Sequence, residues 1–421
     1  MTRIVGIDLG TTNSLVAYMD NGTPRVISAR HERPMVPSVV ALTDNGLIVG
    51  DPAKEHLTRN PERTVYSVKR FMGKSLADVQ GELAYFPYTL TEKGGVIRIK
   101  LGEKSYSPPQ ISAMILKSLK DRAHKKLGKE IKKAVITVPA YFNEAQRQAT
   151  REAGDIAGLE VVRILNEPTA ASLSYDSNHQ KMQKILVYDL GGGTFDVSIV
   201  QAQEGVIEVL ASHGDTQLGG DDFDDLLLKH VILKFQSEHG IDLSQNPVVK
   251  ARLLRAVENA KKHLSYHPFA KIEEEFIAEK EGQALHMDQE LTRLEYEDLI
   301  RPLLLKTMDS VQKALNRGNW FSILLALVAS YFLIQIMLPA RITMSIFNAG
   351  QFSDLTTSSM NVFWAVCIGM FVGAAISYIT EYFTGLGKRP VMSIVQKSAT
   401  GAATNIIAGL GTGMMSTALP V

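Results

Sequence analysis

The sequence predicts an α/β fold of two lobes over residues 1–316, followed by an all-α transmembrane segment of two to three helices over residues 317–421. Two observations predict the first part: a pattern of strand, glycine loop and strand occurs twice, and helical segments separate its strands. One observation predicts the second part, because only four basic and two acidic residues follow Arg317. A boundary near residue 317 therefore divides a charge-rich part from an apolar part.

The charge-rich part is nearly neutral. The whole chain carries 45 Lys and Arg against 44 Asp and Glu, and few of these lie in the tail. Such balance gives no electrostatic case for binding nucleic acid. The single cysteine, Cys367, cannot form an internal disulfide. No long apolar stretch precedes a small-residue cleavage site at the N-terminus, so we expect no secretory signal and a cytoplasmic first part.

A repeat organises residues 1–317. Its two copies are strand Ile4–Ile7, loop Asp8–Thr12 and strand Leu15–Tyr18, and then strand Ile185–Tyr188, loop Asp189–Thr194 and strand Val197–Val200. Each copy is predicted to be a hairpin that opens its own lobe. Two lobes that face each other would place both loops around one polyphosphate.

The composition of these loops fits phosphate and magnesium. Glycines let backbone N–H groups approach phosphate oxygens, and threonine hydroxyls add donors. An aspartate at each strand end can hold Mg²⁺, usually through water. A plain hairpin turn is the alternative for either copy alone, and the occurrence of two copies favours phosphate binding.

Helices are predicted between the strands from their apolar spacing and from residues that start and stop helices. One strand, Ala134–Val138, precedes the second helix. The predicted helices are Pro108–Gly128, Phe142–Gly158, Asp222–Gly240, Pro247–Ser265, and one that starts at the capping box Thr292–Glu295 and ends at about Asn316.

Four motifs closely resemble those of the seventy-kilodalton heat-shock chaperones of the DnaK type. They are Gly6–Ser14 (GIDLGTTNS), Val138–Asn143 (VPAYFN), Asn166–Ala171 (NEPTAA) and Asp189–Asp196 (DLGGGTFD). The resemblance runs from residue 1 to about 316 and implies an actin-like ATPase fold, with two ribonuclease-H-like lobes around Mg-ATP. A sugar kinase of the same superfold would explain the loops but not the second and third motifs.

The resemblance implies roles for residues of these motifs. Asp8 and Asp189 match the magnesium-site carboxylates, and Glu167 and Asp196 match the carboxylates near the attacking water. Lys69 matches the catalytic lysine, where a cation would stabilise the transferring γ-phosphoryl group. The residues implied for the phosphates are Gly10, Thr11, Thr12, Asn13, Gly191, Gly192, Gly193 and Thr194, and Thr194 is also assigned to catalysis.

Further residues match the family outside the two loops. The implied adenosine clamp consists of Glu258, Lys261, Lys262 and Ser265. Without the resemblance, Lys261 and Lys262 would be interpreted as a solvated helix face, and Lys69 as a surface lysine. Pro139 and Arg147 match the pair that relays the nucleotide state to a peptide-binding domain. ATP, ADP and the co-chaperones of the DnaK system are the implied partners.

The chain departs from the family after about Asn316. There the family continues with a strand and a Gly-Gly-x-Thr-Arg loop that forms the floor under adenine, and this chain continues with other residues. We therefore expect a second lobe that lacks part of its sheet, with unpaired strand edges. The peptide-binding domain also has no counterpart, so chaperoning of polypeptides by this chain alone is not expected.

Three uncharged stretches of the tail, Trp320–Leu338, Val362–Thr380 and Ala399–Val421, predict membrane spans. The first two are long enough to cross a hydrocarbon core, at about 1.5 Å per helical residue. The third is rich in Gly, Ala and Thr and would need protein neighbours. A buried soluble helix is the alternative for the first stretch. The prediction implies contact with membrane lipid and an integral membrane location for this part.

The tail resembles a second family, the membrane-bound proton- or sodium-translocating pyrophosphatases. The matching segments are Ile379–Thr384, Lys388–Val391, Ser398–Gly409 and Ser416–Val421, within a fragment from about Leu315. Hydrolysis of pyrophosphate needs clustered aspartates around several Mg²⁺ ions. The tail offers only Asp354 and Glu381, so no complete site is expected.

Three hypotheses on function follow. The first is an ATP-binding domain of a DnaK-type chaperone, impaired by loss of the adenine loop. The second is a fragment of a pyrophosphate-energised ion pump that is inactive alone. The third is that two genes were joined and that the product has no native function; Gln312–Arg317 fits both families and could have mediated the join.

Overall fold

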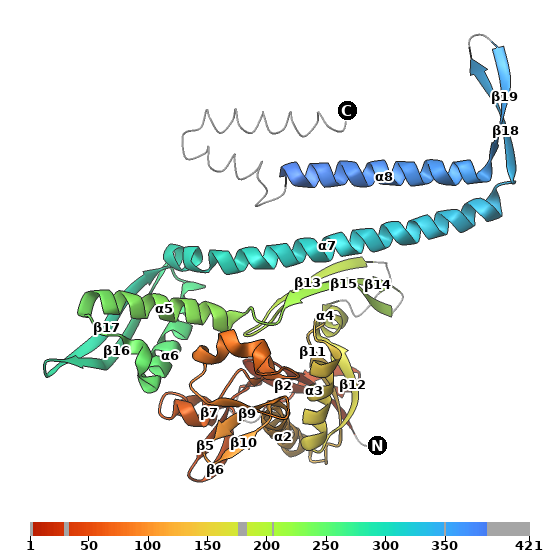
Figure 1. The fold of residues 1–421 in the computed structure, drawn as a ribbon. Helices are drawn as coiled ribbons and strands as arrows, with labels where there is room; N and C mark the ends of the chain where they lie inside the picture. The colour runs from red at the N-terminus through yellow and green to blue at the C-terminus, as the bar shows by residue number, and fades with distance from the viewer. Residues whose placement is uncertain (1–2, 29–32, 176–182, 204–205, 349–350, 385–421) are drawn as a thin grey trace. The chain divides into compact units, whose positions relative to one another are not determined.

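A computed structural model describes residues 3–28, 33–175, 183–203, 206–348 and 351–384 (Figure 1). The chain divides into two compact units, Met1–Arg317 and Gly318–Val421. Each unit is described by itself. The strands and helices of the first unit confirm the predicted α/β fold of that part.

The first lobe is built on a sheet in which strands follow the order β12-β11-β1-β2-β3, and β4 pairs with β2. Its strands are β1 (Ile4–Leu9), β2 (Asn13–Asp20), β3 (Thr23–Val26), β4 (Val36–Pro37), β11 (Lys133–Val138) and β12 (Glu160–Asn166). β1 lies at the centre, antiparallel to β2 and parallel to β11. Val5, Ile7 and Leu9 are buried because alternate residues of a strand face the same side.

Two helices of this lobe occur where the sequence predicts them, and the second is two residues shorter at each end than predicted. Helix α2 (Pro108–Leu127) starts with a capping box between Ser107 and Gln110 and stops at Gly128, whose φ of 63° suits glycine. Helix α3 (Glu144–Ile156) starts with a capping box of Asn143. Both capping residues satisfy backbone N–H groups that the first helical turn leaves unpaired. The other elements of this lobe are α1 (Asp51–His56), α4 (Glu167–Tyr175), β5 (Val40–Thr43), β6 (Gly46–Val49), β7 (Thr64–Val65), β8 (Leu90–Lys93), β9 (Val96–Leu101) and β10 (Lys104–Tyr106).

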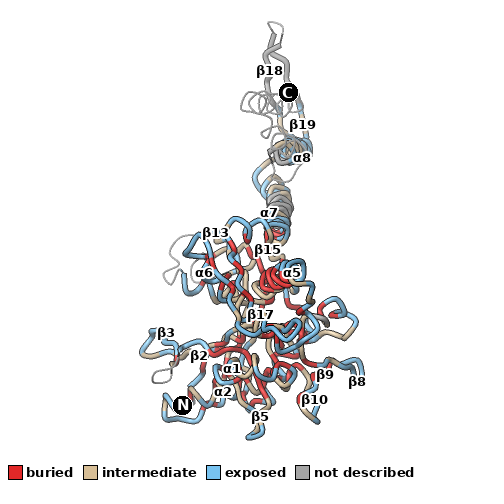
Figure 2. The backbone as a smooth tube through the Cα atoms, turned by 90° about the vertical axis from the view of Figure 1, so that its left-hand side faces the viewer, coloured by how far each residue is buried: buried red, intermediate tan, exposed pale blue. Residues whose placement is uncertain are grey.

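The second lobe repeats the hairpin of the first. Its elements are β13 (Gln183–Leu190), β14 (Phe195–Gln203), β15 (Val206–Asp215), α5 (Gly220–His239), α6 (Pro247–Leu264), β16 (Phe269–Lys280) and β17 (Gln283–Thr292). The main sheet has the order β13-β14-β15, and β16 pairs with β17. Helix α5 buries one face, and Phe223, Leu227 and Val231 of that face belong to the core of the lobe. Part of its tube is accordingly coloured as buried in Figure 2.

The two main sheets differ at the strand that starts each hairpin. In the first lobe β1 has the parallel neighbour β11, whereas among the described residues the edge of β13 opposite β14 has no strand partner. Leu186 and Tyr188 of β13 are 46% and 44% exposed, so one face of this strand is also partly uncovered. The second lobe therefore presents an open sheet edge of the kind that the departure near residue 316 predicts.

The prediction of an all-α tail is wrong. Helix α7 runs from Arg293 to Met337 without the expected end near Asn316, and the hairpin of β18 (Arg341–Asn348) and β19 (Gln351–Ser358) precedes α8 (Ser359–Thr384). Alternation of residues such as Ile342, Met344 and Ile346 with polar neighbours favours a strand, and the uncharged length of the tail concealed this pattern.

The prediction of transmembrane helices is contradicted as well. Over the part of the chain that the structure describes, no helix has the length and apolar character needed to cross a membrane. A span needs about 20 consecutive apolar residues. The third stretch, Ala399–Val421, lies outside the described residues, as do the pyrophosphatase-like segments after Thr384.

The open edge of β13 should drive self-association. Replacing Leu186 with lysine places a charge on the edge strand and should slow aggregation by at least about twofold, because edge charges oppose strand pairing between chains. Light scattering of the purified chain at 37 °C measures the rate. Leu173→Lys is the matched control, since Leu173 is equally exposed at 46% but lies on α4. Equal effects of the two substitutions would contradict a role of the edge.

Candidate active site

The glycine loops of the two lobes lie against each other. A Cβ atom added to Gly192 would lie 1.8 Å from Thr12 Oγ1, and one added to Gly193 would lie 2.6 Å from Thr11 Cγ2. Within the first loop, a Cβ on Gly10 would lie 2.1 Å from the carbonyl oxygen of Asn13. Only glycine fits at these distances, so the close approach of the loops explains the residue type.

Backbone hydrogen bonds fix the second loop. The N–H of Gly191 donates to the carbonyl of Thr194 at 3.0 Å and closes the turn between β13 and β14. The N–H groups of Gly220 and Asp221 donate to the carbonyls of Gly191 and Gly192, at 2.9 and 2.7 Å. The loop is thus held by the segment that starts α5.

Lys69 lies among carboxylates and is buried. Its Nζ is 2.8 Å from Glu167 Oε1, and the side chain of Lys69 is only 7% exposed. Burial disfavours the ammonium, but the carboxylates of Glu167 and Asp8 outweigh it and raise the pKa of Lys69. Lys69 is therefore a protonated cation within a buried cluster, in contrast to the alternative of a surface lysine.

Three aspartates predicted for the site surround this cation. Thr137 Oγ1 donates to Asp8 Oδ1 at 2.9 Å, and the N–H of Tyr141 donates to Asp196 Oδ1 at 3.2 Å. Burial raises the pKa of Asp189, against the attraction of Lys69. Burial and then the charge of Glu167 raise the pKa of Asp196 to about 7. The structure thus brings Asp8, Glu167, Asp189 and Asp196 together around Lys69.

The donor set fits a magnesium ion that carries phosphate. Thr12 Oγ1 is buried and has no hydrogen-bond partner within the described chain. Buried hydroxyls are normally paired, so this atom is free to bind a ligand group such as a phosphate oxygen. No group of three or more His, Cys, Asp or Glu side chains that could hold a metal occurs over the described ranges. Two carboxylates suit Mg²⁺ nonetheless, since this ion usually keeps water and takes phosphate oxygens.

The predicted clamp residues lie on or just after α6, and the three charged ones have protein partners. Glu258 pairs with Lys54 of the first lobe at 3.1 Å, and Lys262 also pairs with Glu258. Lys261 pairs with the buried Asp224 at 2.7 Å and donates to the carbonyl of Gly220. Ser265 is exposed at the C-terminal end of α6. The interpretation of both lysines as a solvated face holds for Lys262 but not for Lys261.

A pocket of about 480 Å³ adjoins the clamp, and the sequence analysis missed part of its wall. Lys261 and Ser265 line one side. The residues from the other side, on α7, are Arg293, Tyr296, Glu297, Ile300, Arg301 and Leu304. They recur at intervals of three and four residues, which places them on one helical face. This spacing was the feature of the sequence from which the wall could have been predicted.

The two relay residues lie beside the third motif. The guanidinium of Arg147 donates to Asn166 Oδ1 at 2.8 Å and to the carbonyls of Phe142 and Ala140. Pro139 is buried after β11. Arg147 therefore ties the start of α3 to the end of β12.

Asp224 should make stability depend on pH. Burial raises its pKa to about 6 from 3.8, against the attraction of Lys261. A raised folded-state pKa stabilises the protein fully below about pH 4, and this contribution is lost as pH rises through 6. It amounts to at most about 3 kcal/mol. Asp224→Asn should flatten the fall in the free energy of unfolding between about pH 4 and pH 6, measured by urea denaturation. Identical slopes for both proteins would contradict this.

Comparisons with known proteins agree with this geometry. The family model described as Hsp70 protein matches residues 4–321, and the model described as inorganic H⁺ pyrophosphatase matches residues 297–421. The chain is 47% identical over 320 residues to a protein of Emiliania huxleyi named "Chaperone protein dnaK", which covers 75% of this chain and 51% of that one. It thus spans about half the length of this curated relative. With three quarters of its residues matched, the chain belongs to the Hsp70 family, and it continues into a fragment similar to the proton pyrophosphatases.

Proposed function

We propose that residues 1–316 form a nucleotide-binding domain that holds Mg-ATP between the two glycine loops. The observation that carries the proposal is the contact of these loops across the lobes, with the buried Thr12 hydroxyl unpartnered within the described chain. Thr11, Thr12 and Asn13 would bind phosphate from one side. Gly191 to Thr194 would bind it from the other side through backbone N–H groups.

Asp8 and Asp189 would hold the magnesium ion, directly or through water. When bound, the ion neutralises charge on the phosphate oxygens. The two carboxylates lie at equivalent places, at the ends of β1 and β13. Thr137 orients Asp8 by its hydrogen bond, so this carboxylate is positioned before any ion arrives.

Lys69, Glu167 and Asp196 would carry the transfer of the γ-phosphoryl group to water. The ammonium of Lys69 is protonated and would stabilise the charge that develops on the transferring group. Glu167 and Asp196 would accept hydrogen bonds from the attacking water and orient it. The pKa of Asp196, about 7, suits a carboxylate that receives a proton near neutral pH. Thr194 would add a donor beside them.

Nucleotide turnover would be impaired. The clamp of Glu258, Lys261, Lys262 and Ser265 would cover one side of an adenosine site. Lys261 and Ser265 line the pocket there, together with residues of α7. The Gly-Gly-x-Thr-Arg loop of the family does not follow α7 in this sequence. The adenine ring would therefore be enclosed less well than in a complete domain, which weakens binding.

We assign residues 1–316 to a DnaK-type ATPase domain and residues 317–421 to a fragment similar to a membrane pyrophosphatase. Co-chaperones of the DnaK system are the proposed protein partners, and the cytoplasm is the proposed location of the first domain. Pump activity by this chain is disfavoured because Asp354 and Glu381 are the only acidic residues after Arg317. A joining of two genes is favoured by the overlap of the two family matches within α7, residues 297–321. An amplified genomic product that spans codons 300–330 would test it.

Magnesium-dependent binding of ATP tests the metal site. Asp8→Asn should weaken the affinity for Mg-ATP by at least about tenfold, because the variant removes one of two carboxylates. Isothermal titration calorimetry measures the dissociation constant with and without Mg²⁺. Asp20→Asn is the matched control: Asp20 ends β2 of the same hairpin and pairs with Arg25 at the surface. A wild-type chain that binds no ATP would refute the proposed function.

We also expect weak or absent ATP turnover. The rate of phosphate release by the purified chain should fall at least about tenfold below that of a complete DnaK-type domain, because the adenine site is incomplete. A coupled phosphate assay at saturating Mg-ATP measures it, and Lys69→Met gives the background. A rate equal to that of the complete domain would contradict the proposed impairment.

A further inference from the structure

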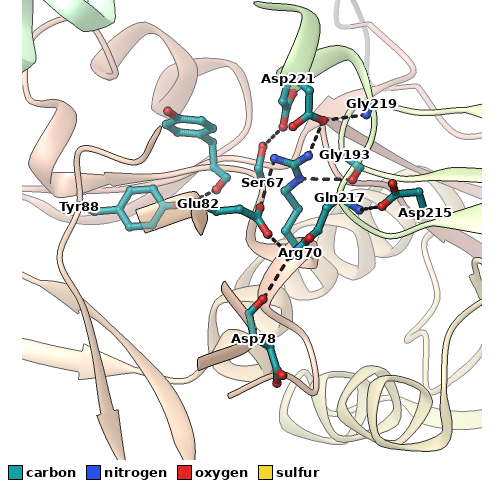
Figure 3. Close-up of polar contacts among 12 residues, drawn as sticks. Ser67, Arg70, Asp78, Glu82, Tyr88, Gly193, Asp215, Gln217, Gly219 and Asp221 are labelled. Carbon is teal, nitrogen blue, oxygen red and sulfur yellow. Dashed lines mark hydrogen bonds and ion pairs between the residues drawn. The ribbon is translucent and has the colours of Figure 1, made fainter. Parts of the chain in front are cut away.

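Arg70 is a buried arginine that bridges the two lobes. It follows Lys69 in a 3₁₀ turn, residues Val68–Phe71, and is 2% exposed. Figure 3 shows its side chain between Glu82 and Gly193. Its Nη2 donates to Asp222 Oδ2 at 2.5 Å, and its Nη1 lies 3.3 Å from Glu82 Oε2. Burial of a guanidinium is costly unless it is paired, so these partners define its position. Asp222 belongs to the second lobe and Glu82 to the first.

The third group of this guanidinium reaches the phosphate loop. Arg70 Nε donates to the carbonyl oxygen of Gly193 at 3.2 Å. The carbonyls of Gly191 and Gly192 already accept from the N–H groups of Gly220 and Asp221. All three successive carbonyls of the loop are therefore held, and only the third is held by the opposite lobe.

The orientation of each carbonyl determines that of the next N–H group. A trans peptide unit is planar, so the C=O of one residue and the N–H of the following residue point in opposite directions. The bonds from Gly220 and Asp221 thus orient the N–H groups of Gly192 and Gly193. By the same geometry the bond from Arg70 orients the N–H of Thr194.

The neighbourhood keeps Arg70 in this position. Asp222 Oδ2 also accepts from the N–H of Gly219 at 2.7 Å, which ties it to the start of α5. Ser67 donates to Asp221 Oδ2 at 2.5 Å, parallel to the bridge made by Arg70 (Figure 3). A Cβ on Gly193 would lie 3.0 Å from Arg70 Nε, so the approach requires glycine at this place.

We propose that Arg70 is a positioning residue: by holding the carbonyl of Gly193 it directs the N–H of Thr194 toward the nucleotide phosphates, so that the first lobe completes the phosphate loop of the second. The inference rests on the proposed function, which supplies the nucleotide phosphates as the ligand. The positioning role of Arg70 rests on the geometry of the loop. Arginine is required because its planar fork serves Nε and both Nη groups at once, whereas lysine is a point charge on a flexible stem.

The test uses the full chain and its variants Arg70→Lys and Arg70→Ala. Hydrogen exchange without nucleotide reports on the loop through the amides of Gly191 and Asp221, whose acceptors are Thr194 and Gly192. Titration with Mg-ATP reports on phosphate binding. The control Arg252→Lys alters another arginine of the chain, which contacts Glu274 within the second lobe at 2.7 Å.

Arg70→Lys should keep the ion pair with Asp222 and the fold, as judged by circular dichroism. It should nevertheless reduce protection of the two amides, and weaken binding of Mg-ATP, each by about tenfold. Arg70→Ala should reduce the amide protection and the affinity for Mg-ATP further, and Arg252→Lys should change neither quantity. Rescue of protection and affinity by lysine would show that charge alone suffices and would overturn the proposal.

The two readouts separate the inference from the function on which it rests. If the wild-type chain binds no Mg-ATP, the proposed function is refuted. Reduced amide protection in Arg70→Lys would even then support the role of Arg70 in holding the loop. Unchanged protection in Arg70→Lys would overturn the inference, whatever the affinity for Mg-ATP.

Discussion

Ion pairs between the lobes, buried at Arg70 and partly exposed at Lys54, are the interactions on which the site depends. The ion pair of Arg70 with Asp222 and that of Lys54 with Glu258 both join residues of different lobes. A buried charge without a partner is costly, so separating the lobes would require water to replace each partner. The glycine loops approach closely because these pairs hold the lobes together, and the buried cluster around Lys69 follows from the same closure.

The second lobe is the less complete of the two. Five strands of the first lobe lie in one continuous order, and the parallel strand β11 covers one side of β1. In the second lobe β13 occupies the place of β1, and its outer side has no strand partner among the described residues. The residues proposed to bind phosphate lie at the ends of β1 and β13 alike, so half of the proposed site stands on a sheet with an exposed edge. The two glycine loops can thus lie close together although the second lobe, which carries one of them, has an incomplete sheet.

Local chemistry made much of this structure predictable. The turns at Gly10 and Gly191 to Gly193, and the ends of α2 at Ser107 and Gly128, follow from residue type and short spacing. Asp8 and Asp189 could be predicted because each ends a recognisable strand and lies in a motif that resembles the family. Arg70 was missed because its partners Gly193 and Asp222 lie more than a hundred residues away. The spacing of apolar and polar residues along the chain does not predict a contact between residues so far apart in sequence.

The tail was predicted wrongly from a local pattern. Uncharged length was interpreted as membrane-spanning helix, although a strand hairpin lies between α7 and α8 and no described helix is suited to cross a membrane. Length and lack of charge do not distinguish a helix from a strand when polar residues such as Thr343 and Ser345 alternate with apolar ones.

Helix α7 explains how two unrelated sequences can share one continuous element. A helix closes its hydrogen bonds over four residues, so its backbone is satisfied whatever sequence follows at a given turn. A change of sequence within a strand would instead disturb its pairing with a neighbouring strand that can lie far away in the chain. Evolutionary exchange of gene segments should therefore be tolerated best at sites that encode the middle of a long helix. The overlap of two families between residues 297 and 321 lies at such a site.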